Sequence, residues 1–155
     1  PKDSLGYLFW DLYHKNKFKF PGNPGGMFFE FSVPHDSLHL LAGYNTTLEG
    51  EILVSTFTAA MLNSEYSVAG HIFPALMVFH LGFPLYGINQ GGHINHLNIE
   101  RFWEAFSRGY EMQHNLFDGV WDFWSVAKTP LEVLRVNDQV PPLLPEGSKA
   151  GLADL

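Results

Sequence analysis

Apolar side chains recur along this chain at the spacing of an α-helix, and no stretch alternates apolar and polar residues as a half-buried strand does. Near the start they occupy positions three or four apart: Leu5, Leu8, Phe9, Leu12 and Tyr13. Similar patterns predict helices at about 4–16, 32–43, 46–61, 64–81 and 95–111, and short ones near 118–124 and 129–136. The sequence therefore predicts an all-α, single-domain bundle of about six helices.

The chain has 155 residues, which suits one domain with a substantial core. We expect the helical domain to cover residues 1–140. After Asn137 the composition turns to proline, glycine and short polar residues, so residues 141–155 are expected to form an extended or mobile tail. No apolar run reaches the about 20 residues of a membrane-spanning helix. A cytoplasmic protein is expected, although the start at Pro1 leaves a removed leader open.

Composition narrows the classes of partner. A net charge of −7 argues against a nucleic-acid surface. The aromatic share of 15% predicts either a bulky core or an apolar surface for a ligand, a lipid or a second copy. Peripheral membrane contact and a homodimer therefore stay open. Because cysteine is absent, any metal ion must bind through nitrogen and oxygen atoms.

One stretch, residues 33–51, concentrates side chains that bind divalent metal ions. His35, Asp36 and His39 fall within five residues, and Glu51 follows twelve positions after His39. On a helix, His35 and His39 lie one turn apart on the same face. Asp36 lies about 100° around the helix from His35. It is expected to be either a fourth ligand or a partner that orients a ligating imidazole.

The distribution of charge supports a cation at this stretch. Between Lys19 and Arg101 the chain has no lysine or arginine, but it has six acidic residues: Glu30, Asp36, Glu49, Glu51, Glu65 and Glu100. A buried carboxylate needs a cation or a hydrogen-bonded partner.

The short connection after Gly43 predicts an antiparallel αα-hairpin, in which His39 and Glu51 lie at the same level. The sequence thus predicts a metal site on this hairpin, formed by His35, Asp36, His39 and Glu51.

Other histidines compete less well for a metal ion. His93 and His96 lie three apart near the expected start of a helix, with Glu100 as their one neighbouring carboxylate. His71 and His80 lie on the apolar helix 64–81, where a lone histidine is more often a hydrogen-bonded core residue. That helix is expected to kink at Pro74.

Three acidic residues are assigned to helix starts. Thr46-Thr47-Leu48-Glu49 fits a capping box, which takes Glu49 out of the metal site. Thr129-Pro130-Leu131-Glu132 is a second such pattern, with proline at the first helical position. Asp118 is expected to cap the short helix that follows it.

The motif His35-Asp36-x-x-His39, followed by eleven residues and Glu51, resembles that of the ubiquinone-biosynthesis protein family called Coq-four. Several neighbouring segments are similar to its soluble bacterial members: Ala42-Gly43-Tyr44, Glu49-Gly50-Glu51-Ile52-Leu53 and Phe57. Others resemble its C-terminal part: Arg108-Gly109, Trp121-Asp122 and Leu131-Glu132-x-x-Arg135. The likeness covers roughly residues 4 to 140.

This resemblance implies an all-helical fold with His35, Asp36, His39 and Glu51 as the metal ligands. It also implies a reaction on a polyprenylated hydroxybenzoate precursor of coenzyme Q. In this reaction the ring carboxyl is removed and the ring carbon that carried it is hydroxylated. Long isoprenoid ligands and membranes are further expectations that come from the family.

Three functions are consistent with the metal-binding motif and the apolar composition. The first is a metal-dependent enzyme that decarboxylates a prenylated hydroxybenzoate-like substrate, with zinc favoured and iron, manganese or magnesium as alternatives. The second is a non-catalytic protein that binds an isoprenoid or quinone-precursor lipid, with a metal ion that is structural or holds the head group. The third is a helical structural domain whose His-Asp-His cluster binds nothing.

Overall fold

The computed structural model describes residues 1–84 and 97–143, and within these ranges the chain forms helices and no strand. The predicted all-α class is confirmed. An isolated bridge between Ser4 and Pro130 ties the first helix to the last. The separate helices are α1 (Leu5–Asn16), α2 (Phe29–Ala42), α3 (Leu48–Leu62), α6 (Ile99–Glu111), α7 (Phe123–Val126) and α8 (Leu131–Asn137). Between α3 and α6 a continuous helical segment contains α4 (Glu65–Ser67), η1 (Val68–Ile72), α5 (Phe73–Ala75) and η2 (Leu76–His80).

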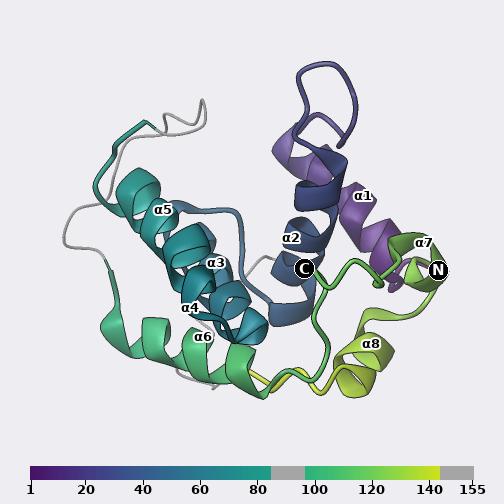
Figure 1. Cartoon of the computed structure of the whole chain (residues 1–155). Coiled ribbons are helices and arrows are strands. Elements are labelled where there is room, and N and C mark those ends of the chain that lie inside the picture. Colours follow the sequence, from purple (N-terminus) through teal and green to yellow (C-terminus); the bar gives the residue numbers. More distant parts are fainter. Residues whose placement is uncertain (85–96, 144–155) are drawn as a thin grey trace.

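Helix α3 is the centre of the fold. It contacts α2, α6 and every part of the helical segment 65–80, and the rest of the described chain is arranged around these elements (Figure 1). Every residue from Ile52 to Met61 is buried, which is typical of a helix that is apolar on all sides. The hydroxyls of Thr56 and Thr58 donate to the carbonyls of Ile52 and Val54, so these polar groups remain satisfied in the core.

Helices α3 and α6 approach closely at a glycine. A Cβ atom on Gly109 would lie 2.1 Å from the carbonyl oxygen of Phe57, so no larger residue fits without moving one of the two backbones. The same face of α6 buries Arg101, Ala105 and Arg108, and its outer face leaves Trp103 and Tyr110 exposed. Within α6 one face is therefore buried, largely against α3, and the opposite face is exposed.

Two arginines fix the C-terminal end of α2. Nη2 and Nε of Arg135 donate to the carbonyls of Leu40 and Leu41, at 2.7 Å and 3.0 Å. Nη2 of Arg108 donates to the carbonyl of Ala42 at 2.9 Å. These carbonyls lack partners within the helix, and positive charge is favourable at this end of the helix dipole. The helix that carries His35 and His39 is thus held by residues about 65 and 95 positions away.

Several predicted helix boundaries need correction. Helix α2 begins at Phe29 and not near Ser32, which places Pro34 inside the helix. The helix predicted from residue 95 begins at Ile99, because the side chain of Asn98 accepts from the amides of Glu100 and Arg101. The segment 65–80 has a π-helical turn on each side of α5, which contains Pro74, and the kink at that proline stays a prediction.

The predicted roles of the capping acids were wrong. Thr47 caps α3 through the amide of Gly50, and Glu49 pairs with Arg101 at 3.3 Å instead of reaching back. Asp118 accepts from the amides of Val120 and Trp121 in a turn, and Asp122 caps α7. At α8 the cap position is Pro130, which has no side-chain cap hydrogen bond, and Glu132 pairs with Arg135 instead.

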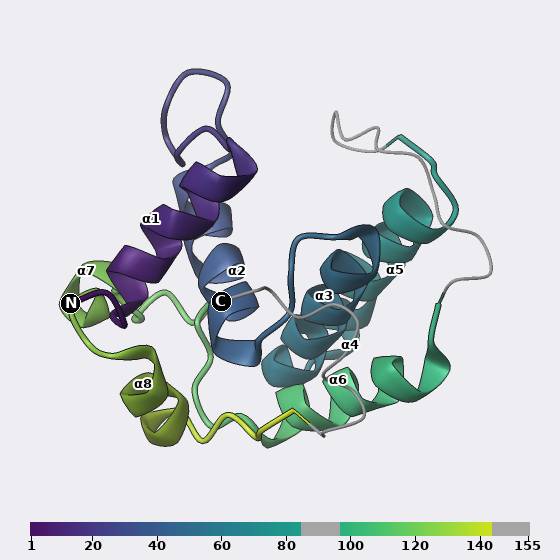
Figure 2. The ribbon, with the colours of Figure 1, turned by 180° about the vertical axis from the view of Figure 1, so that it is seen from behind.

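The antiparallel αα-hairpin is not confirmed. Residues 43–47 leave the lower end of α2 and climb back beside it before α3 begins, so the two helices run in a similar direction in both views (Figures 1 and 2). Five extended residues span about 16 Å, or three helical turns, so a short connection does not force an antiparallel pair. Glu51, one turn into α3, still meets both histidines, since its carboxylate oxygens lie 3.3 Å from Nε2 of His35 and 3.4 Å from Nε2 of His39.

The C-terminal part of the described chain returns to the core. The carbonyl of Pro141 accepts two hydrogen bonds from Arg108, at 2.7 Å and 2.9 Å, so the predicted tail begins as an attached segment. Residues 144–155 lie outside the described residues, and the division at 140 stays a prediction. Among the described helices, none is both long and apolar enough to cross a membrane.

Replacing Gly109 with alanine tests the contact between α3 and α6. We expect Gly109→Ala to lower the free energy of unfolding by about 1–3 kcal/mol, because the added methyl group meets the Phe57 carbonyl. Urea denaturation followed by circular dichroism measures this change. Gly70→Ala is the matched control: nothing lies within 4 Å of its Cβ position, so its stability should be equal or higher by up to about 1 kcal/mol. Equal effects of the two substitutions would contradict the close contact.

Candidate metal centre

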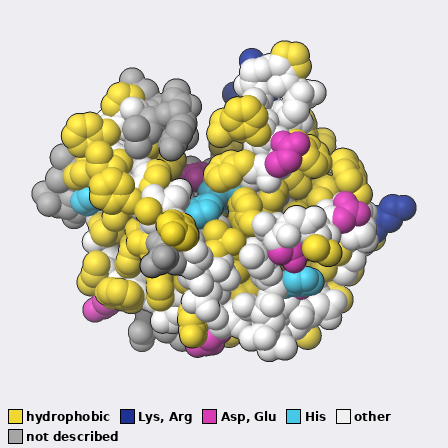
Figure 3. Space-filling model, in the orientation of Figure 1, with side chains coloured by type: hydrophobic (Ala, Val, Ile, Leu, Met, Phe, Trp, Pro, Cys, Tyr) yellow, Lys and Arg dark blue, Asp and Glu magenta, His cyan; other side chains and the backbone are white. Residues whose placement is uncertain are grey.

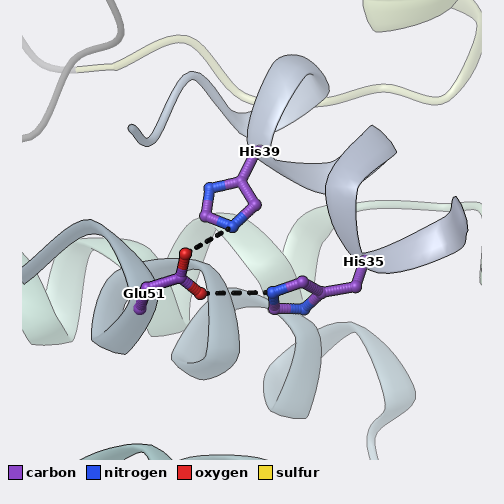
Figure 4. A group of neighbouring side chains, drawn as sticks. All are labelled: His35, His39 and Glu51. Atoms are coloured by element: carbon purple, nitrogen blue, oxygen red, sulfur yellow. Dashed lines mark hydrogen bonds and ion pairs between the residues drawn. The ribbon is translucent and has the colours of Figure 1, made fainter. Parts of the chain in front are cut away.

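His35, His39 and Glu51 meet between α2 and α3. Nε2 of His35 lies 3.3 Å from Oε2 of Glu51, and Nε2 of His39 lies 3.4 Å from Oε1 of the same carboxylate. Each residue offers one ligand atom, and these atoms all lie within 4.8 Å of one another. Figure 4 shows the two imidazoles projecting from successive turns of α2 toward the carboxylate on α3. Three of the four residues predicted as ligands are therefore together.

The hydrogen bond at the other nitrogen of His39 fixes its tautomer. His39 is 1% exposed, and its Nδ1 lies 2.9 Å from the carbonyl oxygen of Tyr44. A carbonyl only accepts, so Nδ1 carries the hydrogen. In the neutral ring Nε2 then has a lone pair, and it is a buried atom without a hydrogen bond to any described residue. A backbone carbonyl that orients an imidazole in this way is typical of metal-ligating histidines.

The charges at this cluster need a cation between them. A bare imidazole nitrogen facing a carboxylate oxygen at 3.4 Å is repulsive unless a proton or a metal ion lies between the two atoms. Burial alone lowers the pKa of His39, but the neighbouring Glu51 carboxylate, together with Asp36, raises it to about 9. Burial raises the pKa of Glu51, but His39 and His35 outweigh burial and lower it well below its usual range. The pair therefore favours one positive charge at the ring nitrogen.

His35 is the more accessible of the two imidazoles. Its side chain is 13% exposed, and its ring stacks on Phe31 with centroids 5.3 Å apart. Its ring also meets the edge of His39, with centroids 5.0 Å apart. Nδ1 of His35 is buried and has no hydrogen bond within the described residues.

Asp36 points to a different partner. The hydroxyl of Tyr13, on α1, donates a short hydrogen bond to Oδ2 of Asp36. Burial raises the pKa of Asp36, and His35, His39 and the bond from Tyr13 partly offset this rise. Asp36 therefore lies beside the cluster without joining the three ligand atoms that converge. Of its two predicted roles, this placement favours the residue that supports the site.

The connection between α2 and α3 is built to position both sides of the cluster. Tyr44, whose carbonyl holds His39, is itself buried, and its hydroxyl accepts from Nη1 of Arg108 at 2.7 Å. Oδ1 of Asn45 accepts from both the amide and the hydroxyl of Thr47. A Cβ atom on Gly50 would lie 2.0 Å from the Asn45 carbonyl, so glycine allows α3 to start this close to the connection.

An aromatic wall beside His35 was missed by sequence reasoning. The rings of Phe31, His71 and Phe117 contact one another, with centroids between 5.8 Å and 6.5 Å apart. These residues come from α2, η1 and the stretch after α6. Burial and the nearby His35 lower the pKa of His71. The one feature of the sequence that marks this position is the presence of Gly70 and Pro74 on either side of His71. Both residue types disturb a regular α-helix.

The surface over this region is apolar. Figure 3 shows histidine side chains at the surface in a hollow flanked by hydrophobic side chains. Met27, Phe28 and Phe29 precede the cluster on the chain and are exposed. A separate groove of about 730 Å³ lies at the C-terminal end of α2, lined among others by Arg108, Glu111, Glu132 and Arg135. None of the three clustered residues lines that groove.

The remaining histidines do not form a second described cluster. Nδ1 of His80 is buried without a hydrogen bond to a described residue. His93 and His96 lie outside the described residues, so their pairing stays a prediction.

No protein-family model matches this sequence, and no curated protein matches it.

Loss of the Tyr13 hydroxyl tests the support of Asp36. We expect Tyr13→Phe to lower the free energy of unfolding by about 1–3 kcal/mol, because the half-buried carboxylate of Asp36 loses its donor. Chemical denaturation at neutral pH measures this change, with Tyr7→Phe as the control at an exposed tyrosine. In an Asp36→Ala background the effect of Tyr13→Phe should largely disappear. An unchanged effect in that background would show that the pair is not coupled.

Proposed function

We propose that this protein is a metal-dependent enzyme in which His35, His39 and Glu51 bind a divalent ion, with zinc favoured. The observation that carries the proposal is the buried Nε2 of His39, which faces the Glu51 carboxylate at 3.4 Å and has no hydrogen bond to a described residue. Two imidazole nitrogens and one carboxylate match the protein ligands of catalytic zinc sites. Iron, manganese or magnesium are the alternatives for this donor set.

The charge balance of the site supports a metal ion over a simple buried ion pair. Glu51 and Asp36 are both half-buried beside the imidazoles, and no lysine or arginine pairs with either carboxylate within the described residues. A protonated His39 would offset one of these negative charges. A divalent cation would offset both, and it would use the nitrogen lone pairs that the neutral rings offer.

The resemblance to the Coq-four family suggests the reaction. A prenylated hydroxybenzoate has a carboxylate for the open side of the site, an aromatic ring for the wall of Phe31, His71 and Phe117, and an apolar tail. The bound ion would supply a Lewis acid that polarises a carboxylate or phenolate oxygen. The protein would orient the ring and exclude water with its aromatic side chains. The proposed activity is removal of the ring carboxyl, with or without oxidation of that carbon.

A second candidate is a non-catalytic protein that binds an isoprenoid or quinone-precursor lipid. The exposed run Met27, Phe28, Phe29 and Phe31, next to the metal cluster, favours this alternative. An apolar tail could lie along these side chains while the metal ion holds an anionic head group. Peripheral membrane contact and a homodimer would use the same kind of surface.

Metal content is the first test. Untagged protein, purified and incubated with Zn²⁺, Fe²⁺, Mn²⁺ or Mg²⁺, should retain one divalent ion per chain, measured by inductively coupled plasma mass spectrometry. We expect His39→Ala and Glu51→Ala to lose this ion. Asp36→Asn should weaken its affinity by about 10–100-fold, as is typical of a residue that supports a ligand. His14→Ala, at an exposed histidine of α1, is the matched control and should retain the ion.

Failure of the wild-type protein to retain any of these ions would refute the proposed site. Incubation of the loaded protein with 3-prenylated 4-hydroxybenzoates, with and without oxygen, then separates enzyme from binder. Loss of the carboxyl in the wild type but not in Glu51→Ala supports the enzyme. Tight binding without turnover for every metal ion supports the lipid-binding alternative.

A further inference from the structure

We infer that His71 is a substrate-contacting residue of this site, and that it donates a hydrogen bond to an anionic oxygen of a ligand bound at the metal ion. This inference rests on the proposed metal site. It adds a fourth functional side chain, from a different helical segment, to the three that meet between α2 and α3.

The position of His71 is set by the aromatic wall. Its ring is nearly parallel to that of Phe31, at 15°, and Phe31 is parallel to the ring of His35 by the same angle. Phe117 closes against both Phe31 and His71, with centroids 6.1 Å and 5.8 Å away. The ring of Phe31 therefore lies between His71 and His35, which is one of the proposed metal-binding residues. In the inferred complex, a ligand of the metal ion lies along the Phe31 ring, with its far oxygen at the His71 ring.

The ring nitrogens of His71 are available. The side chain is half-buried, and neither nitrogen hydrogen-bonds within residues 1–84 and 97–143. Its recorded contacts are with the rings of Phe31 and Phe117. A polar ring that is partly removed from water gains most from a partner that arrives with a ligand. An N–H of the neutral ring suits a carboxylate or phenolate oxygen.

The backbone at His71 gives independent support. His71 lies in the π-helical turn η1, in which the amide of Phe73 bonds to the carbonyl of Val68. Such turns are rare, and they often occur at functional sites because they turn a side chain out of the regular α-helical register. In this π-helical turn the ring of His71 lies against Phe31.

Binding of 4-hydroxybenzoate to the Co²⁺-loaded protein tests this inference without turnover. The visible spectrum of the bound Co²⁺ reports the arrival of the ligand. We expect His71→Phe, which keeps a flat ring in the wall, to weaken ligand binding by about tenfold through loss of one charge-assisted hydrogen bond. Co²⁺ affinity and the unfolding midpoint should stay at wild-type values. His71→Gln retains an N–H donor and should recover part of the affinity.

His14→Phe is the matched control at an exposed histidine and should bind the ligand as the wild type does. Loss of Co²⁺ from His71→Phe would instead make His71 a metal ligand or a residue needed for folding, and would overturn the inference. Wild-type ligand affinity in His71→Phe would also overturn it, while leaving the metal site intact. Absence of Co²⁺ binding in the wild type would refute both the site and the role of His71.

Discussion

The hydrogen bonds of the Arg108 guanidinium are the interactions on which the position of the site depends. It is buried, and it donates to the Ala42 carbonyl, the Tyr44 hydroxyl and the Pro141 carbonyl. Through Tyr44 it also acts on His39, because the carbonyl of the same tyrosine fixes the imidazole tautomer. A buried arginine without these acceptors would be costly, as would the unpaired carbonyl of Ala42. The end of α2, the connection to α3 and the start of the C-terminal segment are therefore determined together.

The fold also explains how so apolar a core can contain ionisable groups. Helix α3 is buried on nearly all sides, and Glu51 stands at its first turn, where the helix dipole favours a negative charge. His39 is fully buried but satisfied at Nδ1 by a backbone carbonyl. Asp36 is satisfied by Tyr13 from a third helix. Each charged group thus has a partner on a different element, and assembly of the cluster requires α1, α2 and α3 to be in place.

The sequence predicted the helices well because apolar periodicity is a local property. It predicted the meeting of His35, His39 and Glu51, since helical spacing and a short connection limit where these side chains lie. It did not predict the direction of α3, because residues 43–47 can run either way and the local sequence does not choose between the two. It misassigned Glu49 for the same reason: the partner that decides its role, Arg101, is more than 50 residues away. His71 was undervalued because nothing local reveals that Phe117 and Phe31 meet it.

The two carboxylates near the imidazoles differ in what they leave free, and this difference bears on the kind of site. One oxygen of Asp36 accepts a hydrogen bond from the Tyr13 hydroxyl, whereas Glu51 directs one oxygen toward each imidazole. A structural zinc site has four protein ligands and is closed, while a catalytic site has three and keeps a position for water or substrate. With Asp36 held away by α1, the converging protein groups are two nitrogens and one carboxylate. For the proposed metal ion, that arrangement favours an open coordination position over a structural role. The partly exposed side of His35, next to the wall of Phe31 and His71, is the face on which such a position would meet a substrate.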